Sequence, residues 1–336
     1  MVDRSVPEEH VPGRHLPEQH SDDGRDLTPT ADLLNLVFGF QPAIGSEHLD
    51  WYYRGNPEGP ASVGTAHDDG HLVGNYALIP LRFHTARSSG TSRVLRLGLG
   101  VDLSTHPESR GTGAFRRTVE DSYRAGTADR LDGILGLANA QSVPRMVETL
   151  GWRCLPDFRA LFLAPLPDGV DTTSHPVDAD LLAGPLPDEA LPRPTEPPPT
   201  GHGTRWTADL LRWRLARPSA RYVLHLREDV AFVSTTSRHG PLRVAVLLKV
   251  LARRAGAVPV SARAIAAVLA GHHRTPLVLH WGATPLLRGG GIALPRRLMP
   301  SPLGIVLHAF DDHGVPRLVE DDLTLTAFEF LDFDAY

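Results

Sequence analysis

A proline-rich segment near the middle of the chain constrains its architecture most. The stretch "PLPDEALPRPTEPPPT" (185–200) is the densest in proline along the 336 residues. Proline lacks a backbone N–H and fixes φ, so this run is predicted to be neither a helix nor a central strand. We therefore expect residues 166–204 to be a partly extended connection between two folded units, each with enough residues for its own core.

The two halves of the chain share a sequence pattern. In each half a helix-like run carries a tryptophan, and a basic residue, a proline and a strand-like run follow it; the tryptophans are Trp51 and Trp213. Self-similarity at a period of about 160 residues indicates an internal duplication. We therefore expect two similar units, the first over residues 28–165 and the second over residues 205–336.

Local signals predict the order of elements in the first unit. Thr30 and Ser46 are expected to cap two helices, and the turn sequence Asp-Asp-Gly at 68–70 joins two strand-like runs. A third strand-like run, a helix, a short buried strand, a helix that begins near Ser142 and a last strand follow. This mixture predicts an α+β fold in which each unit has a mixed, mostly antiparallel twisted sheet flanked by helices.

Composition argues against several classes of protein. The net charge of −5 gives no reason to expect a nucleic-acid partner or an anionic membrane surface. Cys154 is the single cysteine, so we expect no internal disulfide, no cysteine metal cluster and no metal cofactor. Residues 1–27 are polar and rich in proline, which predicts a disordered tail and no signal peptide. Because no apolar run reaches membrane-spanning length, we expect a cytoplasmic protein without a membrane partner.

The stretch "THPESRGTGAF" (105–115) is the strongest chemical signal in the sequence. A β-like run precedes it and an amphipathic helix follows it, so Arg110, Gly111 and Gly113 stand at a helix N-terminus. Free N–H groups, the helix dipole and a closely approaching glycine backbone suit a phosphate or pyrophosphate group. The stretch is too short for a P-loop and lacks the third glycine of the dinucleotide fingerprint. A strand-to-helix turn without a ligand is the alternative interpretation.

Together with "ANAQS" (138–142) and "LGW" (150–152), this stretch resembles the GNAT family of acyl-CoA-dependent N-acyltransferases. The resemblance covers residues 28–165 in element order. It implies that the strand before the loop splays from its neighbour and binds the pantetheine arm, while the loop binds the diphosphate. The whole chain resembles tandem members of the family, in which one unit keeps the cofactor loop.

The resemblance also implies a set of cofactor-binding residues. Acyl-CoA, with an acetyl or a longer acyl group, would be the co-substrate, and an acyl carrier protein is the alternative donor because both present the same pantetheine arm. The implied residues, from the arm to the diphosphate and then to the sulfur end, are Leu103, Thr105, Arg110, Gly111, Thr112, Gly113, Ala114, Phe115, Asn139 and Ser142.

The sequence departs from the family pattern at two positions. Glu108 stands where the loop of most members begins with Gln or Arg. Val147 stands where many members carry the tyrosine that protonates the leaving thiolate. Three interpretations stay open: water protonates the thiolate, another residue replaces the tyrosine, or the site is not catalytic.

Attack of an amine on a thioester also needs a group that takes up a proton. The candidates near the expected cleft are Glu47, His84 and Asp102, and a structural role is the alternative for each of them. We therefore predict N-acyl transfer to the amine of a small molecule, such as an amino sugar or a natural-product intermediate. The alternatives are a non-catalytic pair of units that binds acyl-CoA as a sensor or scaffold, and acyl transfer to peptide or aminoacyl substrates.

Overall fold

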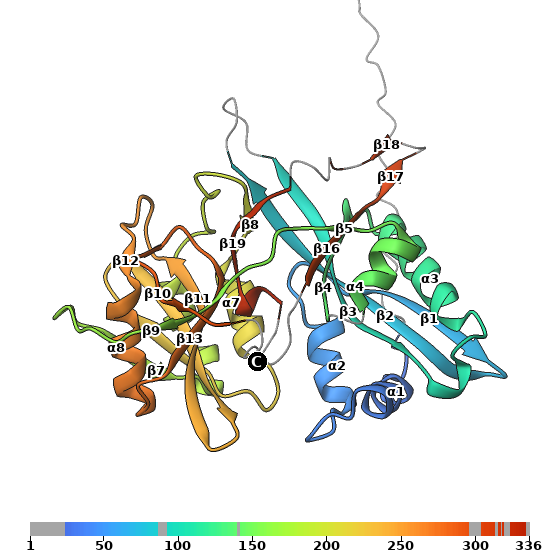
Figure 1. Cartoon of the computed structure of the whole chain (residues 1–336), viewed down its shortest axis with the longest axis horizontal. Helices are drawn as coiled ribbons and strands as arrows, with labels where there is room; N and C mark the ends of the chain where they lie inside the picture. The colour runs from blue at the N-terminus through green and yellow to red at the C-terminus, as the bar shows by residue number, and fades with distance from the viewer. Residues whose placement is uncertain are drawn as a thin grey trace, which may run out of the picture.

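The computed structural model describes residues 24–86, 93–139, 142–295, 304–312, 315–316, 318 and 323–333. Its helices and strands form two units that lie side by side, each built on a twisted sheet with helices packed against it (Figure 1). The predicted α+β class with mixed sheets is confirmed. Most of the tail predicted for residues 1–27 lies outside the described residues.

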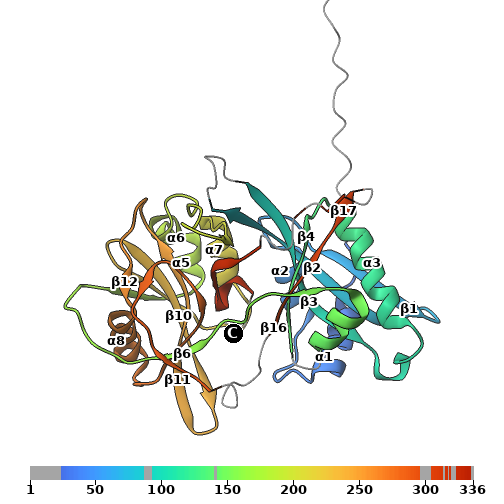
Figure 2. The same ribbon diagram turned by 45° about the horizontal axis from the view of Figure 1, so that its top comes forward.

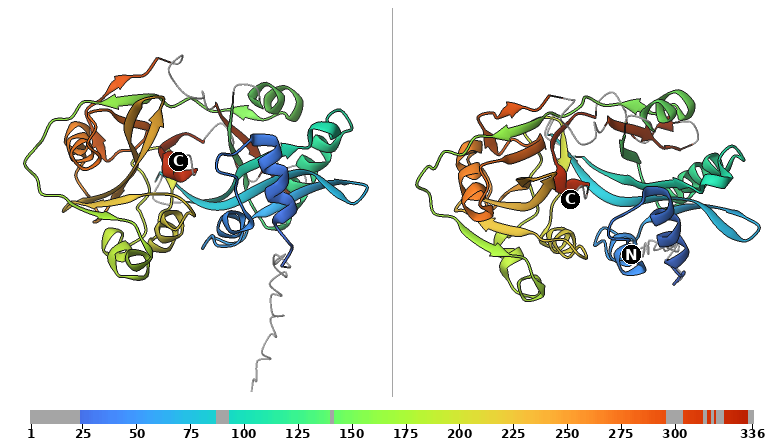
Figure 3. Two further views of the ribbon diagram at one scale, coloured as in Figure 1. Left: turned by 90° about the horizontal axis from the view of Figure 1, so that it is seen from below. Right: turned by 60° about the horizontal axis from the view of Figure 1, so that its bottom comes forward.

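In the first unit, three antiparallel strands are followed by one that runs parallel to the third. β1 pairs with β2 and β2 with β3 in antiparallel register, and β4 joins β3 in parallel after the crossover helix α3. Helices α1 and α2 cover one face of this sheet, and α3 and α4 cover the other (Figure 3). The elements are α1 (Thr28–Phe38), α2 (Ser46–Tyr53), β1 (Ser62–Asp68), β2 (His71–Thr85), β3 (Val94–Thr105), η1 (Pro107–Ser109), α3 (Ala114–Ala128), β4 (Gly133–Ala138), α4 (Ser142–Pro144), η2 (Arg145–Thr149), β5 (Arg153–Cys154) and β6 (Ala160–Leu163).

Two predicted helix caps are not formed. Helix α1 begins at Thr28 and Thr30 lies buried inside it, so Thr30 is not the capping residue. Helix α2 begins at Ser46, and its N-terminus receives no side-chain hydrogen bond. Both helices are instead held by apolar residues such as Leu34 and Leu49, which are completely buried against the sheet. Tertiary packing therefore stabilises these short helices more than their caps do.

The second unit repeats the order of the first. Strands β9, β10 and β11 are antiparallel, and β13 joins β11 in parallel after the crossover helix α8. The elements are β7 (Thr173–Pro176), α5 (Ala179–Ala183), α6 (Leu186–Ala190), β8 (His202–Thr204), α7 (Ala208–Leu215), β9 (Val223–Leu226), β10 (Val230–His239), β11 (Leu242–Ala252), β12 (Val260–Ser261), α8 (Ala262–His273), β13 (Val278–Ala283), β14 (Leu287–Arg288), β15 (Ile292–Ala293), β16 (Gly304–Ala309), β17 (Asp311–Asp312), β18 (Val315–Pro316), β19 (Leu325–Glu329) and η5 (Phe330–Asp332).

The two repeated tryptophans contact each other across the interface between the units. The indole N–H of Trp51 donates to the carbonyl of Trp213 at 2.6 Å, and the indole N–H of Trp213 donates to the carbonyl of Trp51 at 2.8 Å. Their rings stack at a centroid distance of 5.4 Å. This reciprocal contact is what a duplicated unit paired about an approximate twofold axis produces.

The sheets exchange strands between the two halves of the chain. Strand β6, the last strand in the first half of the chain, pairs antiparallel with β13 of the second unit. Strand β16, from the second half of the chain, lies beside β4 in the first sheet (Figure 2) and pairs along its other edge with β5. The division at residues 165 and 205 that we proposed from the sequence therefore describes order along the chain, whereas each sheet holds a strand from the other half.

The proline-rich segment is more structured than predicted. Residues 186–190 form helix α6, with proline in its first turn, where the missing N–H has no intrahelical partner. Strand β7 pairs with β9, and β8 lies between β2 and β19 and so connects the two sheets. The prediction that residues 185–200 form no helix is wrong at α6, and the short strands on either side of this run pair with strands that are distant in sequence.

Candidate functional site

Strands β3 and β4 part along their length and leave a gap in the first sheet. Their parallel pairing runs from Leu97 with Gly133 to Gly100 with Gly136, and β3 then continues to Thr105 without β4 as its partner. A β-bulge follows the last pair, where the register between β2 and β3 shifts and Asp102 adopts a left-handed φ of 58°. The bulge bends β3 away from β4 and leaves polar backbone groups facing the gap.

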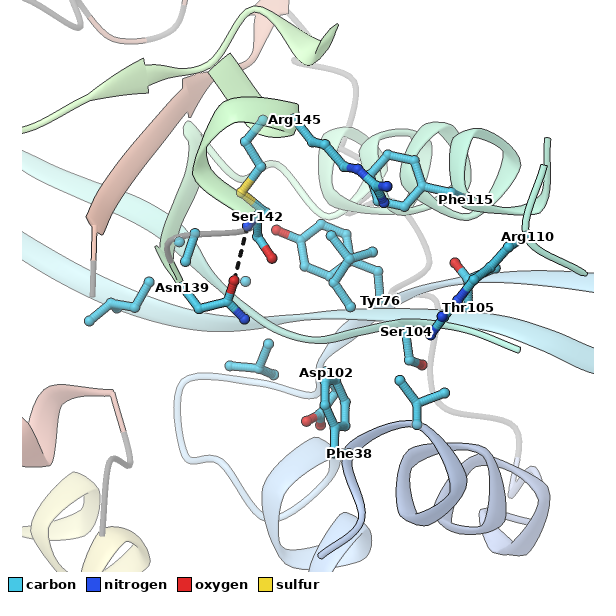
Figure 4. A pocket seen from close by; sticks show the side chains of 18 of the residues that line it. Phe38, Tyr76, Asp102, Ser104, Thr105, Arg110, Phe115, Asn139, Ser142 and Arg145 are labelled. Carbon is cyan, nitrogen blue, oxygen red and sulfur yellow. Dashed lines mark hydrogen bonds between the residues drawn. The ribbon is translucent and has the colours of Figure 1, made fainter. Parts of the chain in front are cut away.

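A cavity of about 820 Å³ occupies this gap (Figure 4). Two predicted cofactor residues do not line it. The Thr112 hydroxyl donates to the carbonyl of Ser109 at 2.8 Å, and Ala114 is completely buried against its neighbours. The other predicted residues line the cavity: Leu103, Thr105, Arg110, Gly111, Gly113, Phe115, Asn139 and Ser142.

The glycine-containing loop places the N-terminus of α3 at the mouth of the cavity. Gly111 and Gly113 have φ values of 85° and 84°, in the left-handed region that glycine adopts without strain. Helix α3 begins at Ala114, and the N–H groups of its first turn lack intrahelical partners. Arg110 is exposed beside them and forms no ion pair with any described residue. Positive charge is therefore concentrated at this end of the cavity.

A second arginine at the same end was not singled out from the sequence. Arg145, in η2, is exposed, lines the cavity and pairs with no carboxylate in the described ranges. Its side chain extends toward Phe115 of α3 (Figure 4). Because 35 residues separate Arg145 from Arg110, no local motif could have paired them. Only the folding of η2 beside α3 makes them neighbours on one cavity.

Asn139 shapes the turn that leaves β4. Its side-chain carbonyl accepts a hydrogen bond from the N–H of Ser142 at 2.9 Å and so caps α4 (Figure 4). The two residues were predicted to contact the cofactor, and this bond holds both at the wall of the cavity. An Asn side chain that mimics a backbone carbonyl in this way is a common device at helix N-termini.

Tyr76 is a further residue of the cavity that sequence reasoning missed. The side chain is 1% exposed, and its hydroxyl has no hydrogen-bond partner in the described part of the chain. It lines the cavity, and its hydroxyl points toward the end that Ser142 lines (Figure 4). A Cβ at Gly100 would overlap this hydroxyl, so the glycine makes room for it where the two strands part. Burial raises the pKa of Tyr76 well above its usual value, and the phenol stays protonated at neutral pH.

Of the three predicted proton acceptors, Asp102 alone lines the cavity. Its carboxylate accepts a hydrogen bond from the Tyr53 hydroxyl at 2.8 Å, and the amide of Asn75 donates to the same hydroxyl at 3.1 Å. Burial and the neighbouring Asp102 raise the pKa of Tyr53 well above its usual value. Tyr53 is therefore a neutral donor that holds the Asp102 carboxylate in place.

Glu47 and His84 lie outside the cavity. Glu47 is exposed in the first turn of α2. His84 lies eight residues beyond Tyr76 on β2, roughly 26 Å along a strand. Burial and the nearby Arg205 lower the pKa of His84. Both residues are close in sequence to elements of the expected cleft. The length of β2 places His84 away from the cavity, and the direction of α2 does the same for Glu47.

The corresponding gap in the second unit is filled by the chain itself. Strand β19 enters beside β13, and the carboxylate of Glu329 lies between β11 and β13. It accepts hydrogen bonds from the backbone N–H of Val250 at 3.2 Å and from His280 Nε2 at 3.0 Å, and Lys249 Nζ lies 3.3 Å from it. In the second unit a carboxylate of the protein thus occupies the place that is an open cavity in the first.

The described residues form neither a cluster of metal ligands nor a membrane-spanning helix. No three His, Cys, Asp or Glu side chains come together as a metal site in the part of the chain that the structure describes. None of the helices within the described ranges combines the length and the apolar content that crossing a bilayer demands.

No protein-family model matches the sequence, and no curated protein matches it. Solved structures do match. A probable N-acyltransferase of unknown function from Enterococcus faecalis is similar over 84% of this chain and 69% of its own, with a TM-score of 0.54 and 12% identity. A GCN5-related N-acetyltransferase from Anabaena variabilis is similar over 83% of this chain and 69% of its own, with a TM-score of 0.53 and 11% identity.

A third match supports the same assignment of fold. A GCN5-related N-acetyltransferase from Kribbella flavida is similar over 85% of this chain and 70% of its own, with a TM-score of 0.51 and 12% identity. In each case the similarity extends over both units, since neither unit alone makes up four-fifths of the chain. The chain therefore has the fold of the GCN5-related N-acetyltransferases.

Proposed function

We propose that the protein transfers an acyl group from acyl-CoA to the amine of a small molecule. One observation carries this proposal: β3 and β4 part beyond Gly100 and Gly136, and the N-terminus of α3 lies at the mouth of the cavity between them with two arginines that pair with no carboxylate in the described ranges. A narrow gap between strands suits an extended arm, and a cationic mouth suits a polyanionic head. Acyl-CoA has both parts in that order.

The donor would be bound by backbone groups and by charge. Arg110, Arg145 and the first-turn N–H groups of α3 would hold the diphosphate. The pantetheine arm would run along β3, whose backbone groups beyond Gly100 are free of β4 and can form hydrogen bonds with its amides. An acyl carrier protein that presents the same arm is the second candidate donor. It would dispense with the contacts at the cationic mouth.

Two side chains that line the cavity from opposite faces of the sheet are proposed to carry out the acyl transfer, Asp102 from the face of α2 and Tyr76 from the face of α3. The amine nitrogen attacks the thioester carbonyl carbon, so the C–N bond forms and the C–S bond breaks. Asp102 takes up the proton that the amine loses, and the Tyr76 hydroxyl supplies a proton to the departing sulfur. Exchange with water then restores both groups. Tyr76 would in this way replace the tyrosine whose usual place Val147 occupies.

The acceptor would be a small molecule such as an amino sugar or a natural-product intermediate. The interface between the two units borders the cavity, because Phe333 of the C-terminal segment lines it beside α1. A pocket with walls from two units suits a bulky acceptor. A non-catalytic role as an acyl-CoA sensor is the competing function, and it is favoured by the loss of the usual tyrosine at Val147.

Melting temperatures test the donor site. Acetyl-CoA or octanoyl-CoA in excess should raise the melting temperature of the wild-type protein, because a ligand that binds only the folded state stabilises it. Arg110→Gln and Arg145→Gln should reduce this shift. Arg116→Gln is the matched control, since Arg116 is exposed on α3, pairs with Glu120 at 2.7 Å and does not line the cavity. If acyl-CoA raised the melting temperature of the Arg110, Arg145 and Arg116 variants by the same amount, the result would contradict the proposed site.

Turnover separates the enzyme from the sensor. Release of free CoA thiol in the presence of a panel of amines would support acyl transfer. A clear melting shift without turnover for any amine would support the sensor instead. No shift with any acyl-CoA, followed by turnover with an acylated carrier protein, would identify the carrier protein as the donor.

A further inference from the structure

The two ends of the cavity differ in chemical character. The end beside α3 and α4 holds both arginines and the loop N–H groups. The end beside α1 and α2 has one charged side chain, Asp102, one polar side chain, Ser104, and otherwise apolar walls. These walls include Phe38 and Phe40 near the end of α1, Leu137 of β4, and Phe333 from the C-terminal segment. The cavity thus passes through the sheet from a cationic mouth to an apolar, acidic one.

Two polar groups lie together at the apolar end. The Asp102 carboxylate faces α2, where Tyr53 holds it. Ser104 lies two residues further along β3, opposite Asn75, and so faces the same side of the sheet. The Ser104 side chain is 2% exposed, and its hydroxyl has no hydrogen-bond partner among the described residues although Ser104 lines the cavity. A buried hydroxyl without a partner costs free energy, which a bound hydrogen-bond donor would offset.

Aromatic rings flank the opening at this end. Phe38 and Phe40 are 45% and 36% exposed, and their ring centroids lie 5.5 Å apart. Two adjacent exposed phenylalanines on a cavity rim are unfavourable in water and favour an apolar ligand. Hydroxyl groups placed against these rings would lose their hydrogen bonds to water without replacement.

We infer that the acceptor is a primary amine on an apolar body, such as an arylalkylamine or an alkylamine, and not a polyhydroxylated amine. This inference rests on the proposed function. The ammonium group is held by the Asp102 carboxylate and the Ser104 hydroxyl, and the apolar body lies against Phe38 and Phe40. Transfer of the proton to Asp102 gives the neutral amine that attacks the thioester.

A long acyl chain is the other apolar group that this end could hold. Asp102 and Ser104 argue against it, because an acyl chain would leave the Ser104 hydroxyl without a hydrogen-bond partner among the described residues and would place the Asp102 carboxylate next to hydrocarbon. The two occupants differ in what the aromatic rim controls. For an amine, the rim sets the KM of the acceptor with acetyl-CoA as donor. For an acyl chain, the rim sets the preference for octanoyl-CoA over acetyl-CoA.

Turnover of three amines with acetyl-CoA tests the inference. We expect 2-phenylethylamine and octylamine to have a kcat/KM about 100-fold above that of glucosamine. Phe38→Ser should raise the KM for 2-phenylethylamine about tenfold and leave that for acetyl-CoA unchanged. Leu36→Ser is the matched control, since Leu36 lies on the same helix, is 56% exposed and does not line the cavity.

A binding measurement keeps the acceptor site testable without turnover. In calorimetry, 2-phenylethylamine should bind the wild-type protein in the presence of CoA and bind Asp102→Asn at least tenfold more weakly. Faster turnover of glucosamine, a Phe38→Ser effect confined to octanoyl-CoA, or equal binding to both proteins would overturn the inference. The proposed function fails separately, if no amine is acylated while acetyl-CoA still raises the melting temperature.

Discussion

Tyr76 offers a test in which stability and activity change in opposite directions. Its hydroxyl is buried and has no hydrogen-bond partner among the residues that the structure describes, and such a group costs about 1 to 3 kcal/mol relative to an apolar group of the same shape. Tyr76→Phe removes the hydroxyl and leaves the ring in its packing against Leu78 and Ile134. We therefore expect the variant to be more stable than the wild type by about 1 kcal/mol or more. For a chain of this size that corresponds to about 2 °C in melting temperature.

Activity should fall in the same variant. If the hydroxyl protonates the leaving sulfur, its removal should lower kcat about 100-fold or more, the usual contribution of a positioned acid. The melting temperature of the ligand-free protein and the steady-state release of CoA measure the two effects. The reasoning is refuted if Tyr76→Phe is less stable than the wild type, which would mean that the hydroxyl has a partner, or if kcat is unchanged.

A second tyrosine, which is partly buried against the same core, serves as control. The Tyr123 hydroxyl accepts a hydrogen bond from the indole N–H of Trp152 at 2.5 Å and lies outside the cavity. Burial raises the pKa of Tyr123 to about 12. Tyr123→Phe should therefore lose about 1 kcal/mol of stability and keep the wild-type kcat. The two variants together separate a functional phenol from a structural one.

Three further predictions concern stability. Gly113→Val should lower the melting temperature and abolish the acetyl-CoA shift, because a β-branched residue at φ 84° is strained by about 1 to 2 kcal/mol. Lys249→Met should lower the urea midpoint by an amount equivalent to about 3 to 5 kcal/mol, since it leaves the buried Glu329 carboxylate without its ammonium partner. Burial and neighbouring histidines lower the pKa of His225 to about 3 and of His273 to about 4. Below pH 6.5 both histidines take up a proton when the protein unfolds, and this favours the unfolded state. The free energy of unfolding from urea titrations should therefore be highest above pH 6.5 and fall by about 3 to 6 kcal/mol toward pH 4.

The chain is unusual in how it uses its single lysine. Lys249 lies buried between the carboxylates of Glu329 at 3.3 Å and Asp332 at 2.7 Å. The Asp332 carboxylate also accepts a hydrogen bond from the indole N–H of Trp206 at 2.9 Å, and the Glu329 carboxylate accepts one from His280 Nε2 at 3.0 Å. This network ties the C-terminal segment into the second unit. We attribute to it the filling of the gap between β11 and β13.

The sequence by itself determined what depends on neighbours along the chain. The strand, loop and helix around Gly111 and Gly113 could be predicted because left-handed turns and helix starts are local events. The α+β class and the duplication followed from periodicity and from the repeated tryptophans. The turn at Asn139 could also be predicted from the sequence, since the hydrogen bond that caps α4 joins residues only three apart.

The tertiary structure alone decided what depends on distant partners. Arg145 and Arg110 are 35 residues apart in sequence, and only the packing of η2 beside α3 brings both to the cavity. Tyr76 and Gly100 lie on neighbouring strands, and only the pairing of these strands places the Tyr76 hydroxyl at the gap. The pairing of β6 and β16 with strands of the other half cannot be predicted from their own residues, because the edge of an antiparallel sheet can pair with any strand that has a suitable hydrophobic pattern. Burial and pairing of this kind are set by the packed fold and not by local propensity. The sequence therefore showed the candidate site along the end of β3, at the loop and at the turn after β4, but not at Tyr76 or Arg145.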